Sequence, residues 1–164
     1  MSKSTAVPLA SFDPITFGHI DIIKRASKIV DKLFIGVPLI NKKKTIFTIT
    51  ERVNLIKAVV NDFNPDLKKR IEVVSFGGLT TNYCKKISAT VIFRGLRVAS
   101  DFEYEFQLAG MNYKLNSNLE TVFLMAEIQN QIISSNFVKE IASLKGDLVQ
   151  FVPNVVIKAL KKKF

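Results

Sequence analysis

The chain has 164 residues, of which 48% are hydrophobic and 23% charged, and this composition is typical of one globular domain with a sizeable core. One cysteine and one histidine exclude an internal disulfide and the usual zinc site, and a single thiol fits a reducing cytoplasm. The net charge of +10 indicates anionic partners, which include nucleic acid, acidic lipid and phosphorylated small molecules.

Strands and helices are predicted to alternate along the chain, on the basis of hydrophobic periodicity. Apolar runs predict strands over 5–11, 33–40, 70–76, 89–95 and 120–126. Helical periodicity predicts helices over 16–30, 52–63, 79–88, 101–115, 134–146 and 153–163. Thr48 and Glu51 form a capping box ahead of the second helix, and the closing KKKF is interpreted as a solvated helix end.

No repeat, linker or composition shift divides the chain, so we expect a single domain over 1–164. No apolar run approaches the roughly 18 residues of a membrane span. The apolar stretch at the start is too short for a signal peptide. We therefore expect a cytoplasmic protein with no membrane partner.

The alternation of apolar strands with helices predicts an α/β fold. Continuous Val, Ile, Leu and Phe runs are typical of parallel strands that are buried on both faces. We expect a doubly wound, Rossmann-like sheet of five parallel strands with helices on both faces. Ligands bind such sheets at the carboxyl ends of the strands, where helix N-termini line a crevice.

Conspicuous residues follow four of the predicted strands, in the segments 11–19, 42–44, 94–97 and 133–136. The first contains the Phe12-Asp13-Pro14 turn and ends at Gly18 and His19, the second is a run of three lysines, the third is RGLR and the fourth is ISSN. Taken singly, a lone histidine, a lysine-rich loop or a serine cap is most often structural. Their convergence on one sheet edge favours an anion site, in which His19 donates a hydrogen bond to a phosphate.

The segment SFDPITFGH resembles the (Ser/Thr)-x-Gly-His signature of the nucleotidyltransferase superfamily. The segments HIDIIKRA, FTITERV, RGLRVASDFEYEFQLAGMN, VFLMA and SSNFVKE are similar to the bacterial phosphopantetheine adenylyltransferase family in order and spacing. The resemblance implies a doubly wound fold, assembled as a homohexamer. It also implies transfer of AMP from ATP to 4′-phosphopantetheine with Mg²⁺, which gives dephospho-coenzyme A and pyrophosphate in the penultimate step of coenzyme A synthesis.

The resemblance also implies the roles of individual residues. The catalytic residues would be His19, Lys43 and Arg94, with Lys42 as the alternative in register and Lys44 as a weaker one. The residues that bind the acceptor would be Ser11, Lys43, Thr80 and Arg94. The residues that contact ATP would be Ser11, Phe12, His19, Gly95, Leu96, Arg97, Glu105, Asn130, Gln131, Ile132, Ile133, Ser134, Ser135 and Asn136. No residue is assigned to a metal.

These residue types suit the implied reaction. The attacking phosphate monoester is largely ionised at neutral pH, because its second pKa is about 6, so no strong general base is needed. The rate then depends on holding two anions together and on stabilising charge at the α-phosphate. Cationic side chains, a histidine and helix N-termini can supply both.

Three other functions remain open at this point. A nicotinate-mononucleotide adenylyltransferase or a cytidylyltransferase of the same fold would share the first motif, although RGLR followed by DFEYE argues against both. A basic nucleic-acid-binding module would explain the net charge, but no helix-turn-helix, RRM-like or zinc-finger signature is present, and we expect no nucleic-acid partner. A nucleotide sensor without catalytic activity is the third.

Overall fold

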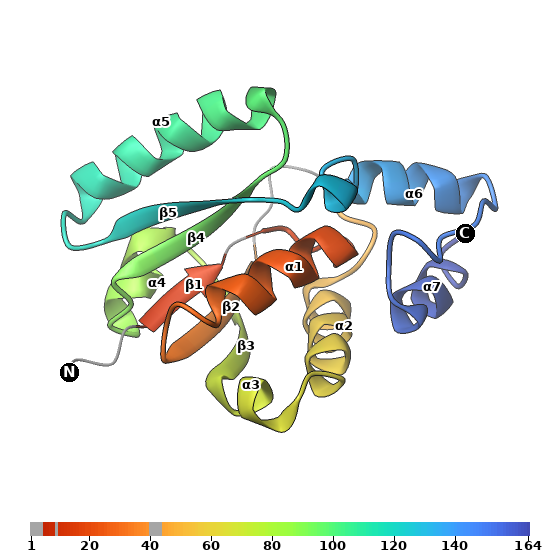
Figure 1. Cartoon of the computed structure of the whole chain (residues 1–164), viewed down its shortest axis with the longest axis horizontal. Helices are drawn as coiled ribbons and strands as arrows, with labels where there is room; N and C mark the ends of the chain where they lie inside the picture. The colour runs from red at the N-terminus through yellow and green to blue at the C-terminus, as the bar shows by residue number, and fades with distance from the viewer. Residues whose placement is uncertain (1–4, 9, 40–43) are drawn as a thin grey trace.

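The computed structural model describes residues 5–8, 10–39 and 44–164, and in this part of the chain five parallel strands form one sheet (Figure 1). The strands are β1 (Thr5–Pro8), β2 (Lys32–Pro38), β3 (Ile71–Phe76), β4 (Val91–Leu96) and β5 (Glu120–Met125). Their order across the sheet is β3-β2-β1-β4-β5, and every neighbouring pair is parallel. The predicted doubly wound fold is confirmed.

The strand order places the topological switch between β1 and β4. The chain moves outward from β1 to β2 and β3, and it then returns past β1 to form β4 and β5. Ala6 of β1 is consequently in register with Leu33 on one side and with Val91 on the other. The loops after β1 and β4 leave the sheet in opposite directions, and this opens a crevice at the carboxyl ends of the two strands.

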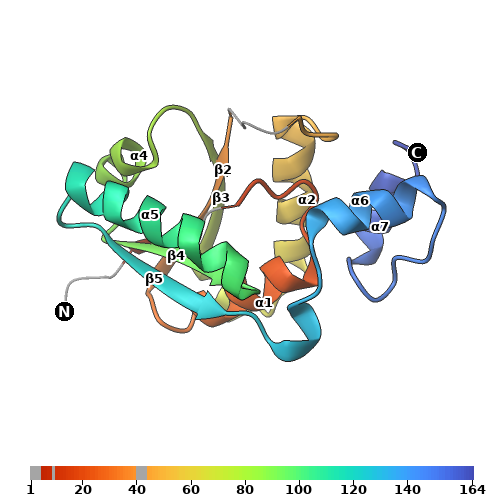
Figure 2. The same ribbon diagram turned by 90° about the horizontal axis from the view of Figure 1, so that it is seen from above.

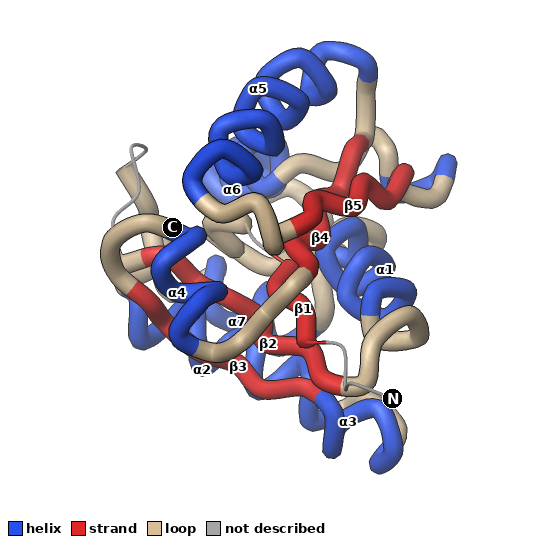
Figure 3. The backbone as a smooth tube through the Cα atoms, turned by 90° about the vertical axis from the view of Figure 1, so that its left-hand side faces the viewer, coloured by secondary structure: helices blue, strands red, loops and turns tan. Residues whose placement is uncertain are grey.

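Helices cover both faces of the sheet, as Figures 2 and 3 show. The helices are α1 (Phe17–Ala26), α2 (Ile49–Asn61), α3 (Pro65–Arg70), α4 (Thr80–Lys86), α5 (Ala99–Leu115), η1 (Ile128–Asn130), α6 (Ser135–Ser143) and α7 (Asn154–Leu160). Helices α1 and α2 lie on one face, and α4 and α5 lie on the other. None of the helices in the described ranges has the length and apolar character needed to cross a bilayer.

Alternate residues of β1 point into two separate cores. Ala6 belongs to the larger core, which α1, α2, α6 and α7 complete. Val7 belongs to a smaller cluster on the opposite face, which contains the buried Cys84 of α4. Burial raises the pKa of the Cys84 thiol to about 11, so this side chain is a packed residue rather than a reactive one.

Several predicted boundaries were too long, and two short helices were not predicted. The first two strands end at Pro8 and Pro38 rather than at residues 11 and 40. Helix α1 ends at Ala26 rather than at residue 30. Helix α3 begins after Asn64, whose side chain accepts a hydrogen bond from the Leu67 N–H at 2.8 Å. Helices α3 and η1 are too short to show helical periodicity in the sequence.

The capping box ahead of α2 is confirmed, and the C-terminal segment packs against it. The Glu51 N–H donates to Thr48 Oγ1 at 3.2 Å, and the Thr48 N–H donates to Glu51 Oε2 at 2.8 Å. Lys163 forms an ion pair with Glu51 at 2.9 Å, and its amine lies 5.4 Å from the centre of the Phe47 ring. All four residues of KKKF are exposed, as expected for a solvated helix end, and Lys163 in addition makes these contacts.

Candidate active site

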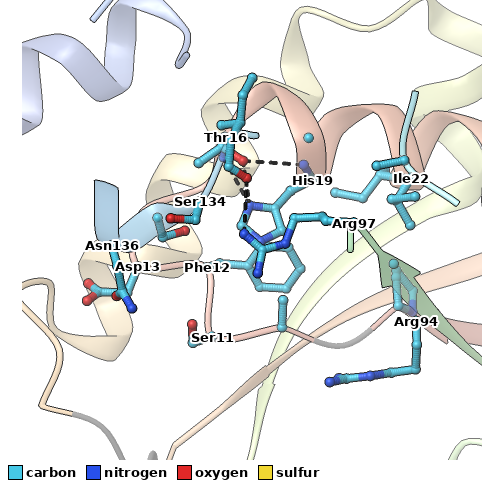
Figure 4. Close-up of a pocket in the computed structure, with 18 of the residues that line it drawn as sticks. Ser11, Phe12, Asp13, Thr16, His19, Ile22, Arg94, Arg97, Ser134 and Asn136 are labelled. Atoms are coloured by element: carbon cyan, nitrogen blue, oxygen red, sulfur yellow. Dashed lines mark hydrogen bonds between the residues drawn. The ribbon is translucent and has the colours of Figure 1, made fainter. Parts of the chain in front are cut away.

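A cavity of about 230 Å³ opens at the carboxyl ends of β1 and β4 (Figure 4). Its walls come from the β1–α1 turn, the loop before α2, the end of β4, the segment after β5 and the start of α6. Lys44, Arg94, Arg97 and Lys139 line it, whereas its acidic lining residue is Asp13. Among the described residues that line the cavity, cationic side chains outnumber acidic ones, and this favours the binding of anions.

Thr16 and His19 fix one wall of the cavity through the capping box of α1. Thr16 is the N-cap residue, and its Oγ1 accepts a hydrogen bond from the His19 N–H at 3.4 Å. The Thr16 N–H donates to His19 Nδ1 at 3.1 Å. Since a backbone N–H can only donate, Nδ1 is an acceptor, and the proton of the neutral ring lies on Nε2.

The His19 ring is held neutral by its surroundings. Burial and the nearby Arg97 guanidinium lower the pKa of His19 from 6.5 to about 4. The ring also packs against Phe12, with 5.0 Å between the ring centres. Phe12 is buried and adopts a left-handed backbone conformation with φ of 48°, which is uncommon for an aromatic residue. At neutral pH the imidazole therefore offers an N–H donor and no charge.

Arg97 connects the loop after β4 to the segment before α6. Its Nε and Nη2 donate to Asp101 at 3.2 and 3.4 Å, and its Nη1 donates to the Ile133 carbonyl at 3.4 Å. The guanidinium thereby lies near the imidazole of His19, which accounts for part of the lowered pKa. Figure 4 shows this side chain beside the His19 ring.

Arg94 and Glu105 form a bidentate ion pair across the crevice edge. Arg94 Nε donates to Glu105 Oε2 at 2.6 Å, and Nη2 donates to Oε1. The two side chains are 19% and 11% exposed, so solvent screens the pair only weakly. Glu105 was predicted to contact ATP, and Arg94 was predicted to bind the acceptor phosphate. In the structure these two side chains contact each other.

The first turn of α6 supplies the opposite wall. Ser134 is the N-cap residue, and its Oγ accepts a hydrogen bond from the Phe137 N–H at 3.1 Å. Ser135 Oγ donates to the Pro14 carbonyl at 2.8 Å, which ties this helix to the β1–α1 turn. The backbone N–H groups at the start of α6 carry the partial positive charge that attracts phosphate.

The predicted site residues divide into three groups. Those that line the cavity are Ser11, Phe12, His19, Arg94, Gly95, Arg97, Ile133, Ser134, Ser135 and Asn136. Those that do not line it are Thr80, Leu96, Glu105, Asn130, Gln131 and Ile132. Lys42 and Lys43 lie outside the described residues. The roles of all three groups remain predictions.

The predicted residues away from the cavity have positions of their own. Thr80 begins α4 at the carboxyl end of β3, on the same edge of the sheet. Leu96 is the buried last residue of β4, and its carbonyl accepts a hydrogen bond from the Ala126 N–H at 2.8 Å. Ile132 is 77% exposed, while Asn130 is buried beside Gly18.

Sequence reasoning assigned no role to four polar residues that line the cavity, namely Asp13, Thr16, Thr45 and Lys139. Thr16 was detectable, because a threonine three residues before His19 has the spacing of a capping box. The contact between Asp13 and Lys139 joins residues 126 positions apart, and no local pattern predicts it.

The described residues do not by themselves form a site for a metal ion. Within the described ranges no three His, Cys, Asp or Glu side chains lie together in a way that could hold one. The carboxylate in the cavity, that of Asp13, already accepts three hydrogen bonds. A hard cation such as Mg²⁺ takes oxygen ligands, and substrate phosphates are the source of oxygen that this cavity would admit.

Comparison of the sequence with known proteins agrees with this geometry. Residues 9–141 match the family model for cytidylyltransferase-like proteins. The phosphopantetheine adenylyltransferase of Pelagibacter ubique is 56% identical over 163 residues, which cover 99% of each chain. That of Caldanaerobacter subterraneus is 47% identical over 97% of this chain and 96% of its own. That of Staphylococcus carnosus is 46% identical over 100% and 99% of the two chains.

Among solved structures, the fold is similar to that of a Plasmodium falciparum nicotinic acid mononucleotide adenylyltransferase. The TM-score is 0.72, and the match covers 98% of this chain and 95% of that one. The identity is only 15%, so this likeness shows the fold alone. The relatives of 46–56% identity extend over nearly the whole chain and show the family. This chain belongs to the phosphopantetheine adenylyltransferase family of cytidylyltransferase-like nucleotidyltransferases.

Proposed function

We propose that this chain transfers the adenylyl group of ATP to 4′-phosphopantetheine, giving dephospho-coenzyme A and pyrophosphate. The observation that carries the proposal is the placement of His19, Arg94 and Arg97 around one cavity at the topological switch of the sheet. Family membership favours this enzyme over a nucleic-acid-binding module.

The reaction exchanges one phosphoanhydride linkage for another. A phosphate oxygen of 4′-phosphopantetheine attacks the α-phosphorus of ATP, and the bond from that phosphorus to the bridging oxygen breaks as pyrophosphate leaves. The nucleophile is already ionised at neutral pH, so no proton has to be removed from it. The cavity therefore serves to position two anions and to stabilise charge at the α-phosphate.

The neutral imidazole suits the second task. His19 Nε2–H would donate to an α-phosphate oxygen, and the Thr16 N–H holds the ring in the tautomer that makes this possible. Because the pKa of His19 is lowered to about 4, the ring acts as a hydrogen-bond donor and not as an acid that titrates during turnover. Arg94 and the lysine loop would hold the attacking phosphate, and the start of α6 would hold the leaving one.

The remaining parts of the proposal concern the metal, the assembly and the compartment. We propose that Mg²⁺ enters with the phosphates of ATP, since phosphate oxygens are the ligands that this ion prefers. We propose a homohexamer in the cytoplasm. The exposed apolar side chains on α5 support a subunit interface, because surfaces of this kind mark protein contacts. These side chains are Phe102, Tyr104, Phe106, Met111, Tyr113 and Leu115.

A coupled assay of pyrophosphate release tests the function. With Mg²⁺, ATP and 4′-phosphopantetheine, the protein should release pyrophosphate and form dephospho-coenzyme A in equal amounts. A panel with nicotinate mononucleotide as acceptor, and with CTP in place of ATP, separates the alternatives of the same fold. Turnover of nicotinate mononucleotide alone would refute the proposal, and inactivity with every pair would indicate the nucleotide sensor. Native mass spectrometry would give the subunit number.

A further inference from the structure

A single buried carboxylate, that of Asp13, joins three segments of the cavity wall. Its side chain is 3% exposed. Oδ1 accepts a hydrogen bond from the Phe47 N–H at 3.0 Å, and Oδ2 accepts one from the Ile46 N–H at 3.1 Å. Lys139 Nζ donates to Oδ2 at 3.1 Å and neutralises the charge. The carboxylate belongs to the β1–α1 turn, and it therefore has two donors from the loop before α2 and one donor from α6.

Each of the three joined segments carries predicted ligand contacts at its other end. Asp13 follows Ser11 and Phe12 directly. Ile46 and Phe47 follow the lysine loop, and Lys44 of that loop lines the cavity. Lys139 lies on α6, whose first turn contains the serines of the other wall. A displacement of any one segment would change the distance between the two phosphates that react.

A buried charge is retained in a protein only where several good hydrogen bonds compensate for its lost hydration. Two backbone N–H groups and an ammonium supply this compensation here, and no uncharged side chain of this size could accept from both N–H groups and pair with the ammonium. If apolar packing alone held the β1–α1 turn against the loop before α2, a charged side chain at Asp13 would not be needed. Phe47 is in fact buried in the core, yet its N–H still points at this carboxylate.

We propose that Asp13 is a positioning residue for adenylyl transfer. Through its buried carboxylate it sets the spacing between the loop before α2 (44–48), which we assign to the acceptor phosphate, and the first turn of α6, which we assign to the phosphates of ATP. It acts through the residues that it holds and does not itself contact the reacting phosphates. The inference rests on the proposed function, since it assigns the two held segments to the two substrates.

The two sides of the carboxylate can be tested separately. Asp13→Asn loses the charge, and its amide can accept from only one of the two N–H groups, so both segments should loosen. Lys139→Met removes only the α6 partner and leaves both backbone hydrogen bonds in place. The inference therefore predicts that Asp13→Asn raises KM for both substrates, whereas Lys139→Met raises KM for ATP alone. Lys139→Arg, which keeps a positive donor, should restore the KM for ATP.

Steady-state kinetics with matched controls decide the question. Misplacement by about 1 Å costs up to about 100-fold in rate, so a decrease of about 10- to 100-fold in kcat/KM is expected for Asp13→Asn. Asp147→Asn is the matched control, because that carboxylate also accepts a backbone N–H, from Val149 at 3.1 Å, in the exposed loop before α7. Ile56→Val, in the core, controls for a lowered melting temperature.

Hydrogen exchange provides a readout that does not depend on turnover. The amides of Ile46 and Phe47 should exchange faster in Asp13→Asn than in the wild type, and their exchange rates should be unchanged in Lys139→Met. KM values for Asp13→Asn that match those of either control, or unchanged exchange at both amides, would overturn the inference. If Asp13→Asn does not fold, the selective effect of Lys139→Met on ATP decides alone. An inactive wild type would count against the proposed function. The exchange experiment would still test whether Asp13 holds the loop before α2.

Discussion

The backbone N–H of Thr16 donates to Nδ1 of His19 at 3.1 Å, so the single imidazole of this chain, which lines the cavity, carries its proton on Nε2. The residue at the third position of a helix usually closes a capping box with a Glu or Gln side chain. Here a histidine does so, and the same hydrogen bond that caps α1 also selects the tautomer. Local helix geometry therefore prepares the donor that the proposed reaction needs.

The first prediction is that His19 titrates with a pKa of about 4, well below its ordinary value. Because the chain has one histidine, its ring signals can be assigned in an NMR titration without mutants. At neutral pH the nitrogen shifts should show the proton on Nε2. A midpoint near 6.5 would show instead that the ring is solvated and that Arg97 has no effect on it.

The same lowered pKa gives the stability a pH dependence of known sign. Between pH 6.5 and about 4 the unfolded chain binds a proton at His19 that the folded chain does not bind. The contribution of this group to the free energy of unfolding therefore decreases as the pH falls through this window, and it is fully regained above pH 6.5. Comparison of denaturant midpoints for wild type and His19→Gln at pH 7.5 and 5 isolates it, since the variant lacks the titrating ring.

The second prediction concerns the role of His19 in turnover. His19→Ala should lower kcat by about 10²–10³, or about 2.7–4 kcal/mol, and leave the affinity for ATP nearly unchanged, because the donated bond matters most in the transition state. His19→Gln keeps an N–H donor and should recover part of this loss. Equal activity of the two variants would contradict a donor role, and a melting curve of each would expose a merely structural one.

The third prediction concerns the ion pair of Arg94 and Glu105. Arg94→Ala should raise KM for the acceptor, since a charge-assisted hydrogen bond is worth about 1.5–3 kcal/mol. Glu105→Gln weakens the pair and keeps the shape of the side chain, so it should produce a smaller increase in the same KM. If Glu105→Gln changes only the KM for ATP, the carboxylate acts on the nucleotide, as the family resemblance implies, and not through Arg94.

The fourth prediction concerns the register of the basic loop. Of the single variants Lys42→Ala, Lys43→Ala and Lys44→Ala, the second should show the largest loss of kcat/KM for 4′-phosphopantetheine. A lysine that faces solvent loses little on truncation, so comparison of the three variants identifies the one that holds the phosphate. Similar values for all three would indicate a diffuse attraction rather than one phosphate ligand, and a dominant effect of Lys42→Ala would shift the register by one residue.

Much of the fold follows from local patterns in the sequence. Apolar runs and helical periodicity were sufficient for the five strands, for the capping box at Thr48 and for the parallel arrangement, since each depends on residues close together in the chain. The same patterns placed Ser11, His19, Arg94 and the serines at the start of α6 at one sheet edge, because the carboxyl ends of parallel strands must meet there.

Only the tertiary structure decided how these residues are partnered. The sequence gives no sign that Glu105 faces Arg94, that Arg97 lies near His19, or that Asp13 holds both the loop before α2 and Lys139. Each of these is a contact between groups brought together by the winding of the sheet. Hydrogen bonds and ion pairs depend on distances of a few ångströms, and spacing along the chain does not determine such distances between separate elements.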